Sequence, residues 1–146
     1  MDHKYVNYLN ELLSNSFVLN VKFHRYHWYI KGRNFFQLHE VFEDLYTYFA
    51  DVSDELAERI LMIEGEPLAT MAAYLRESTI EEATADDTEE EIISQIIEDL
   101  SEVNASIAKT GIPLATEEED EATLDMLISM QQTLEKYRWM FKAYQQ

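Results

Sequence analysis

Two pairs of potential metal ligands lie in the stretch between residues 39 and 58. His39 and Glu43 form the first pair, and Asp54 and Glu58 form the second, and the members of each pair are four positions apart. If this stretch is helical, that spacing places all four side chains within about 100° of one another around the helix axis. Imidazole nitrogens and carboxylate oxygens are ligands of Fe(II), Zn(II) and Mn(II). The pattern therefore predicts the binding of a divalent transition-metal ion.

The four residues cannot surround one ion within a single chain. His39 and Glu58 would lie about 28 Å apart along a helix, whereas a metal–ligand bond is about 2 Å long. Their positions are symmetric, because the mean of 39 and 58 is 48.5 and so is the mean of 43 and 54. Two copies of this helix crossing antiparallel about a two-fold axis would bring His39 to the partner's Glu58 and Glu43 to the partner's Asp54. The spacing predicts two identical sites at a dimer interface.

A second imidazole comes from His27, which precedes the turn between the first two predicted helices and can reach the neighbourhood of His39. The predicted ligands are His27, His39 and Glu43 from one subunit, with Asp54 and Glu58 from its mate. The alternative is that the histidines are ordinary helix-face residues and that the acidic pairs are solvated. Asp54 and Glu58 lie among apolar residues, and carboxylates on a face that is buried need a partner. The combination favours a metal site, whose open positions would admit an oxidant.

Long helices must position these residues. Apolar and interior residues recur at steps of three and four over about 4–30, which predicts a helix that ends at Gly32. A second helix is expected from an N-cap at Asn34 to Gly65. Residues 66–87 are expected to form a connector that contains one short helix at about 71–75. Trp28 and Tyr26 are expected to pack in the core.

Two further helix starts are signalled by capping-box spacing. Thr88-x-x-Glu91 predicts a helix over about 89–109, and Thr116-x-x-Glu119 predicts one over about 117–144. Between them, Gly111 and Pro113 are expected to end the third helix. The residues expected on the inner faces of these two helices are Ile92, Ile93, Ile96, Ile97, Leu100, Val103, Leu124, Leu127, Ile128, Leu134, Trp139 and Phe141, and the tail aromatics Tyr137, Trp139, Phe141 and Tyr144 are expected to be core or interface anchors. Four long helices with a long link between the second and the third predict an all-α four-helix bundle in one domain, residues 1–146.

The composition narrows the class of protein further. The 146 residues include no cysteine, so thiolate metal sites, thiol nucleophiles and disulfides are excluded. Acidic residues number 29 against 11 Lys and Arg, which gives a formal net charge of −18. Such a charge repels phosphate backbones and anionic lipid and attracts cations. With no apolar run of about 18 residues and no signal-peptide pattern at its start, the chain is expected to be soluble, cytoplasmic and without a membrane partner.

Several motifs resemble those of the Dps family, the mini-ferritins. The matching strings are His27-Trp28-Tyr29-Ile30-Lys31-Gly32, Asn34-Phe35-Phe36-Gln37-Leu38-His39, Asp54-Glu55-Leu56-Ala57-Glu58-Arg59-Ile60, Asp125-Met126-Leu127 and Trp139-Met140-Phe141-Lys142-Ala143. The resemblance implies a ferritin-like four-helix bundle with a short helix in the long crossover between helices two and three, assembled as a hollow homo-dodecamer. It also implies a ferroxidase that oxidises Fe(II), preferentially with hydrogen peroxide over dioxygen, and stores ferric mineral in the cavity, which protects the cell from oxidative damage.

The same resemblance carries over particular residues. The implied iron ligands at the two-fold interface are His27, His39, Asp54 and Glu58, with Trp28 close to the iron. One position departs from the family, which commonly has Asp where this chain has Glu43. The reach and denticity of that ligand are therefore expected to differ.

Acidic pores at one type of three-fold axis admit iron in family members. Glu121 and Asp125 resemble the pore residues, and Asp120 and Glu117 are expected to add charge there. DNA-binding members often carry a flexible Lys-rich N-terminal extension, whereas only three residues precede Lys4 in this sequence. No DNA binding is expected. A DNA-binding nucleoid protein and a non-catalytic helical scaffold remain the alternatives to the ferroxidase.

Overall fold

The computed structural model describes residues 2–84 and 88–146, in which all the regular elements are helical. In chain order they are α1 (His3–Tyr29), α2 (Phe35–Met62), α3 (Met71–Glu77), α4 (Glu89–Ser106), the π-helical turn η1 (Ile107–Gly111), α5 (Ile112–Glu117) and α6 (Glu121–Tyr144). The chain divides into two compact units, one of Leu9–Ile92 and one that combines the residues up to Tyr8 with Ile93–Gln146. Among the described residues, no helix combines the length and apolar character that crossing a bilayer requires.

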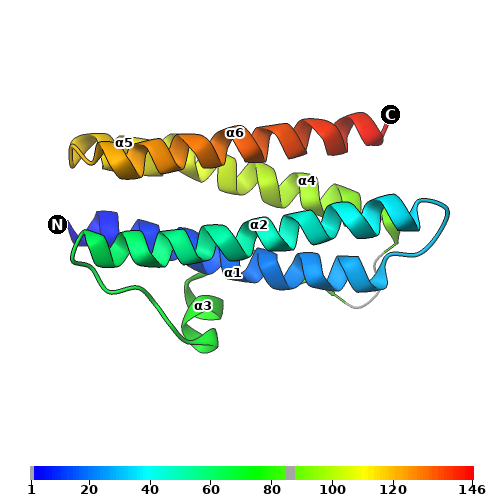
Figure 1. The fold of residues 1–146 in the computed structure, drawn as a ribbon, viewed down its shortest axis with the longest axis horizontal. Coiled ribbons are helices and arrows are strands. Elements are labelled where there is room, and N and C mark those ends of the chain that lie inside the picture. The colour runs from blue at the N-terminus through cyan, green and yellow to red at the C-terminus, as the bar shows by residue number, and fades with distance from the viewer. Residues whose placement is uncertain (1, 85–87) are drawn as a thin grey trace. The chain divides into compact units, whose positions relative to one another are not determined.

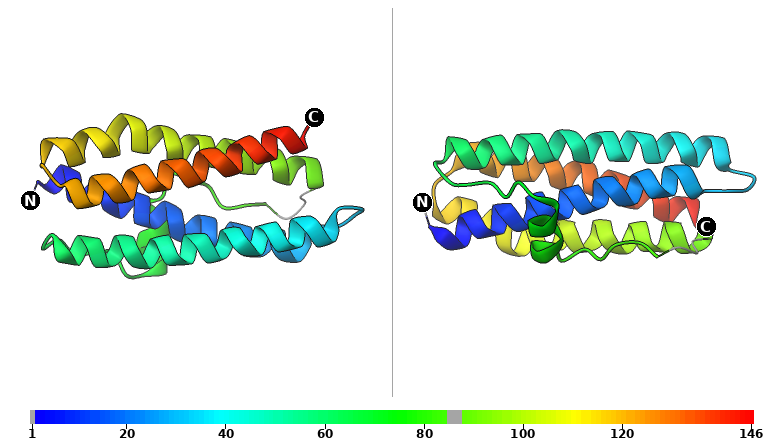
Figure 2. Two further views of the ribbon diagram at one scale, coloured as in Figure 1. Left: turned by 45° about the horizontal axis from the view of Figure 1, so that its top comes forward. Right: turned by 90° about the horizontal axis from the view of Figure 1, so that it is seen from below.

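The unit of Leu9–Ile92 is built on a helical hairpin. Figure 1 and Figure 2 show α1 and α2 running side by side in opposite directions. The link between them includes Gly32, whose φ of 115° is a conformation that glycine adopts at no steric cost. Both helices match their predicted positions, except that α2 ends at Met62 rather than near Gly65. The helix ends earlier because Glu64, with φ 66°, takes the left-handed position, and Gly65 N–H donates to the Ile60 carbonyl at 2.8 Å.

Aromatic rings fill the interface between α1 and α2. Phe23 from α1 stacks on Phe49 from α2 with centroids 5.8 Å apart, and it meets Tyr26 edge-on at 6.0 Å. All three rings are fully buried, as is Phe42. The predicted core position of Tyr26 is confirmed. The same prediction for Trp28 is wrong, because a residue two positions further along lies about 200° further around the helix, and this indole is 66% exposed.

Two asparagines of α1 bind the connector that follows α2. The Asn10 amide donates to the Glu66 carbonyl at 3.0 Å and accepts from the Leu68 N–H at 2.9 Å. Asn15 accepts from the Thr79 N–H at 2.8 Å. The predicted short helix exists as α3 and extends two residues past its expected end at 75. Of the expected connector over 66–87, residues 85–87 lie outside the described residues.

The start of α4 confirms the N-cap at Thr88 that the first capping box predicts. The Glu91 N–H donates to Thr88 Oγ1 at 3.2 Å, and the Thr88 hydroxyl donates to the Glu91 carboxylate at 2.9 Å. These bonds satisfy a donor that the first helical turn leaves without a partner in the helix.

Gly111 and Pro113 do not stop the helical path, contrary to the prediction. The chain passes from α4 through the π-helical turn η1 directly into α5, where Pro113 lies in the first turn. Pro113 has no N–H to bond the preceding turn, so one hydrogen bond of the helical path is absent at this position, directly after the irregular π-helical turn. Gly111 is needed for a close approach, since a Cβ at this position would lie 2.8 Å from a ring carbon of Tyr8. The Tyr8 hydroxyl lies 3.0 Å from Ser106 Oγ at the end of α4.

The second predicted capping box is also wrong, because Asp120 caps α6 instead. Asp120 Oδ1 accepts from the Thr123 N–H at 3.1 Å, and Oδ2 accepts from the hydroxyls of Thr123 at 2.6 Å and Tyr5 at 2.7 Å. Glu119, with φ 56°, forms the turn just before this cap. The helix therefore starts at Glu121 rather than at residue 117, since the carboxylate of Asp120 finds more donors than the hydroxyl of Thr116.

The inner faces of α4 and α6 largely match the prediction. Ile97 and Leu124 are half-buried, and the predicted residues that are buried are Ile92, Ile93, Ile96, Leu100, Val103, Leu127, Leu134 and Phe141. Ile128, at 39%, and Trp139, at 66%, are exposed, so their placement on the inner face is wrong. Among the tail anchors, Tyr144 is exposed and Tyr137 is half-buried. Arg138 Nε donates to Ser101 Oγ at 2.6 Å, which ties α6 to α4.

We expect Asp120→Ala to lower the free energy of unfolding by about 2 kcal/mol, because it removes the cap and leaves buried donors without their acceptor. Thr116→Ala, at the exposed position that the sequence favoured as a cap, should change it by less than about 0.5 kcal/mol. Urea unfolding followed by circular dichroism measures both. Equal losses in the two variants would contradict the cap assigned to Asp120.

Candidate metal centre

Two histidines lock the end of α1 to the start of α2. His27 lies in the last turn of α1, and His39 lies in the second turn of α2. Nδ1 of His27 is 2.6 Å from the His39 carbonyl, and Nδ1 of His39 is 2.7 Å from the His27 carbonyl. A ring nitrogen that faces a carbonyl oxygen carries the proton, so Nε2 of each neutral imidazole keeps its lone pair. This is how metal-binding histidines are commonly oriented.

The two imidazoles are also stacked, and other rings enclose them. Their centroids lie 3.6 Å apart with 12° between the planes. Phe35 stacks on His39 at 4.7 Å, while Tyr46 meets His27 edge-on at 5.3 Å. His27 is buried and His39 is half-buried. The positions of both Nε2 atoms are therefore set by packing as well as by hydrogen bonds.

Glu43 adds a carboxylate to this pair. Its Oε1 lies 3.9 Å from His27 Nε2, and its side chain is exposed. Metal–ligand bonds to imidazole and carboxylate are about 2.0–2.2 Å long, so one cation between the two atoms can bind both. The structure thus brings together three of the five predicted ligands, His27, His39 and Glu43.

Asp54 and Glu58 are not part of this cluster. They lie further along α2 with exposed side chains, and Asp54 is about 16 Å from Glu43 along the helix axis. Within residues 2–84 and 88–146, no group of three or more His, Asp and Glu side chains is arranged to hold a metal ion by itself. One chain supplies three of the five predicted ligands at this position, and the shared site stays a prediction about a pair of chains.

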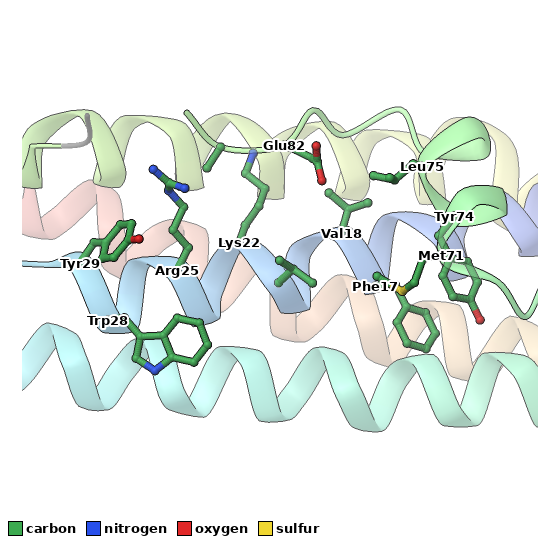
Figure 3. A pocket seen from close by; sticks show the side chains of 12 residues that line it. Phe17, Val18, Lys22, Arg25, Trp28, Tyr29, Met71, Tyr74, Leu75 and Glu82 are labelled. Atoms are coloured by element: carbon green, nitrogen blue, oxygen red, sulfur yellow. The ribbon is translucent and has the colours of Figure 1, made fainter. Parts of the chain in front are cut away.

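Trp28, which was expected close to the iron, lines a neighbouring pocket of about 420 Å³. The pocket lies between α1 and the segment that contains α3, and Figure 3 shows the indole of Trp28 and the guanidinium of Arg25 leaving α1 in different directions. Tyr74 from α3 also lines it and donates its hydroxyl to the Leu68 carbonyl at 2.8 Å, and burial raises the pKa of this phenol. None of the five predicted ligands is among the described residues that line this pocket.

The four predicted pore residues fall into two groups. Glu117, Glu121 and Asp125 are exposed near the junction of α5 and α6. The prediction that Asp120 adds charge to the pore is corrected, because its carboxylate is buried and caps the N-terminus of α6. Its position in a run of acidic residues concealed the cap, which only the donors of Tyr5 and Thr123 identify.

An aromatic cluster beside the histidine pair is not predicted by the sequence. His24 stacks on Tyr46 with centroids 3.7 Å apart and 15° between the planes. The Asn20 amide donates to the Tyr46 carbonyl at 2.7 Å. The three-residue step from His24 to His27 was the available signal, but Tyr46 is remote in sequence from both.

The comparisons with known proteins agree with this architecture. The family model for the ferritin-like domain matches residues 6–146. A curated DNA protection during starvation protein from Brevibacillus brevis is 44% identical and covers 93% of this chain and 91% of its own. A crystal structure of a Dps protein from Bacillus brevis has a TM-score of 0.95 at 41% identity, with both chains covered completely. A Dps structure from Vibrio cholerae, described as a member of a broad superfamily of ferritin-like diiron-carboxylate proteins, has a TM-score of 0.92 at 33% identity and covers 98% of this chain and 89% of its own.

These matches define a ferritin-like protein. The predicted all-α fold, a ferritin-like four-helix bundle with a short helix in the crossover, is thereby confirmed. Because both the sequence and the structural relatives are Dps proteins, the chain belongs to the Dps family.

The stacked rings of His27 and His39 predict that the two side chains stabilise the fold cooperatively. In a double-mutant cycle with His27→Ala and His39→Ala, each substitution removes the hydrogen bond of its own Nδ1 and also the single ring stack, which can be lost only once, so the coupling free energy should be about 1 kcal/mol. Urea unfolding at one subunit concentration, with a chelator present to remove metal, measures it. His27→Ala combined with Ser53→Ala, further along α2, serves as the control and should be additive within about 0.5 kcal/mol. An additive His27–His39 pair would contradict a stabilising stack between the two rings.

Proposed function

We propose that this chain is a ferroxidase and iron-storage protein, which oxidises Fe(II) preferentially with hydrogen peroxide and deposits ferric mineral inside a homo-dodecameric shell. The observation that carries the proposal is the half-site of His27, His39 and Glu43, in which two imidazoles present Nε2 and a carboxylate oxygen lies 3.9 Å from one of them. Nitrogen and carboxylate donors without thiolate suit Fe(II). Membership of the Dps family supports the same reading.

The second half of the site comes from another copy of α2. Asp54 and Glu58 share a helix face with His39 and Glu43 and are exposed in the single chain. Two α2 helices antiparallel about a two-fold axis would bring Glu58 of the partner subunit to His39 and Asp54 of the partner subunit to Glu43. The contact is isologous, so each dimer interface holds two sites.

Iron is the substrate of this reaction. Two Fe(II) ions each give one electron to a hydrogen peroxide molecule, whose O–O bond breaks to leave two hydroxide ions. The carboxylates of Glu43 and of Asp54 and Glu58 of the partner subunit stabilise the higher charge of Fe(III) more than that of Fe(II), which favours the oxidised product. The locked imidazoles hold their lone pairs in position before iron arrives, so little reorganisation is needed.

The acidic surface provides a route for the substrate. We place the entry pore at Glu121, Asp125 and Glu117, which are exposed near the junction of α5 and α6, and leave out the buried Asp120. A lining of one sign of charge raises the local concentration of cations. In this proposal residues 1–146 act as one ferritin-like domain.

Mixing two inactive variants tests whether the site is shared between chains. His39→Ala and Asp54→Ala should each oxidise Fe(II) with peroxide much more slowly than the unaltered protein. When the two are unfolded together and reassembled, half of the interfaces pair unlike chains, and each of these has one intact site. We expect the mixture to recover about a quarter of the original rate, measured by ferric absorbance after anaerobic mixing.

The matched control is the double variant His39→Ala with Asp54→Ala, reassembled alone, which should recover nothing. Full rates in the single variants would overturn the assignment of these residues. Slow single variants without recovery in a reassembled mixture would argue that the site does not span two chains.

The DNA-binding and scaffold alternatives predict different results. With a net charge of −18 per chain, we expect no shift of duplex DNA in a gel at physiological salt, because like charges repel. Sedimentation should show a twelve-subunit particle, and Fe(II) should disappear faster than in buffer. A DNA shift would favour the nucleoid protein, an assembly that leaves Fe(II) untouched would favour the scaffold, and a monomer or dimer would contradict the shell.

A further inference from the structure

A third histidine lies beside the proposed iron site and is not among its predicted ligands. We propose that His24 is a metal ligand, whose Nε2 binds the second Fe(II) ion together with Glu43 and the partner's Asp54. This inference rests on the proposed function, because the carboxylate of the partner subunit is part of the site. It adds one imidazole to the predicted set of five ligands.

The hydrogen bond of His24 fixes which of its ring nitrogens carries the proton. Nδ1 of His24 lies 2.8 Å from the Asn20 carbonyl, so Nδ1 carries the proton and Nε2 has the lone pair. His27 and His39 have the same arrangement, each with Nδ1 at a backbone carbonyl. A carbonyl at one ring nitrogen fixes the tautomer and increases the basicity of the other, which is what a metal ligand requires.

The ring of His24 is held in place by its neighbours. It stacks on Tyr46 at 3.7 Å, and Trp28 lies against it with centroids 5.4 Å apart. Asn20 supports both rings of the stack, since its carbonyl faces His24 and its side-chain amide donates to the Tyr46 carbonyl. His24 is half-buried rather than extended into solvent. A fixed ring with an available nitrogen is preorganised to bind an ion.

His24 also lies next to the candidate site along α1. Because α1 and α2 are antiparallel, His27 lies beside His39, while His24, one turn earlier on α1, lies beside Tyr46. Tyr46 in turn contacts His27, so the two clusters are continuous. Under the proposed two-fold relation, position 46 faces position 51 of the partner and position 43 faces position 54, since each pair averages 48.5. His24 therefore lies on the side of the site where the partner's Asp54 arrives.

The stoichiometry of the reaction calls for such a residue. Peroxide accepts two electrons, so a site that holds two Fe(II) ions can reduce it completely without a one-electron intermediate. The five predicted ligands leave each ion with few protein donors, and a single nitrogen from His24 completes a set of three imidazoles and three carboxylates for two ions. Three donors per ion with open positions for the oxidant is a common arrangement for catalytic metals.

Cobalt binding without any redox reaction tests this assignment. Co(II) is titrated into the assembled, metal-free protein, and binding is followed by calorimetry and by the visible absorbance of the ion. The unaltered protein should bind two Co(II) ions per subunit. His24→Phe keeps a ring to stack on Tyr46 but lacks Nε2, so the second ion should bind at least tenfold more weakly while the first is unchanged. His3→Phe, at an exposed histidine at the start of α1, is the control and should bind as the unaltered protein does.

The outcomes distinguish a failure of this inference alone from a failure of the proposed function. If His24→Phe binds two Co(II) ions with unaltered affinity and spectrum, His24 is only a packing residue and the inference is overturned, while the ferroxidase proposal stands. If the unaltered protein binds no Co(II), both are overturned. A second readout covers the case in which His24→Phe does not assemble. The Co(II)-loaded unaltered protein should show three paramagnetically shifted, exchangeable imidazole N–H signals in NMR, and two signals would refute the assignment.

Discussion

The exchange of hydrogen bonds between His27 and His39 is the constraint on which the site depends. Each imidazole uses Nδ1 to bond the other residue's carbonyl, so the last turn of α1 and the second turn of α2 hold each other in register. The same bonds direct both Nε2 atoms away from the backbone. One interaction therefore joins the two helices and sets the geometry of the candidate ligands, so the fold and the candidate metal centre cannot be altered independently at this point.

Much of the fold follows from helical periodicity and local capping. The extents of α1, α2 and α3 and the cap at Thr88 depend on residues close in sequence, which is why the sequence predicts them. The start of α6 depends on Tyr5, far away in the chain, whose hydroxyl favours Asp120 over Thr116 as the cap. Trp28 was placed in the core on hydrophobicity, although its angular position relative to Tyr26 puts it outside.

The candidate site likewise contains features that the sequence predicts and features that it does not. Spacing alone indicates which residues share a face of α2, and it places His27 near His39, so the proximity of His39 and Glu43 to His27 could be predicted from sequence, whereas their role as ligands stays a prediction. Asp54 and Glu58 depend on a second chain, and their symmetry about position 48.5 is the only trace of it in the sequence. The surroundings of His24 could not be predicted, because the ring that orients it, Tyr46, comes from the neighbouring helix.

The two asparagines that bind the connector have a consequence for the order of folding. Asn10 and Asn15 are side chains of α1, and they satisfy backbone groups of the connector at residues 66, 68 and 79. These anchors are in position only when α1 is helical, so we expect the crossover between α2 and α4 to dock after the hairpin of α1 and α2 has formed. In this order the local contacts form first, and closure of the long loop follows.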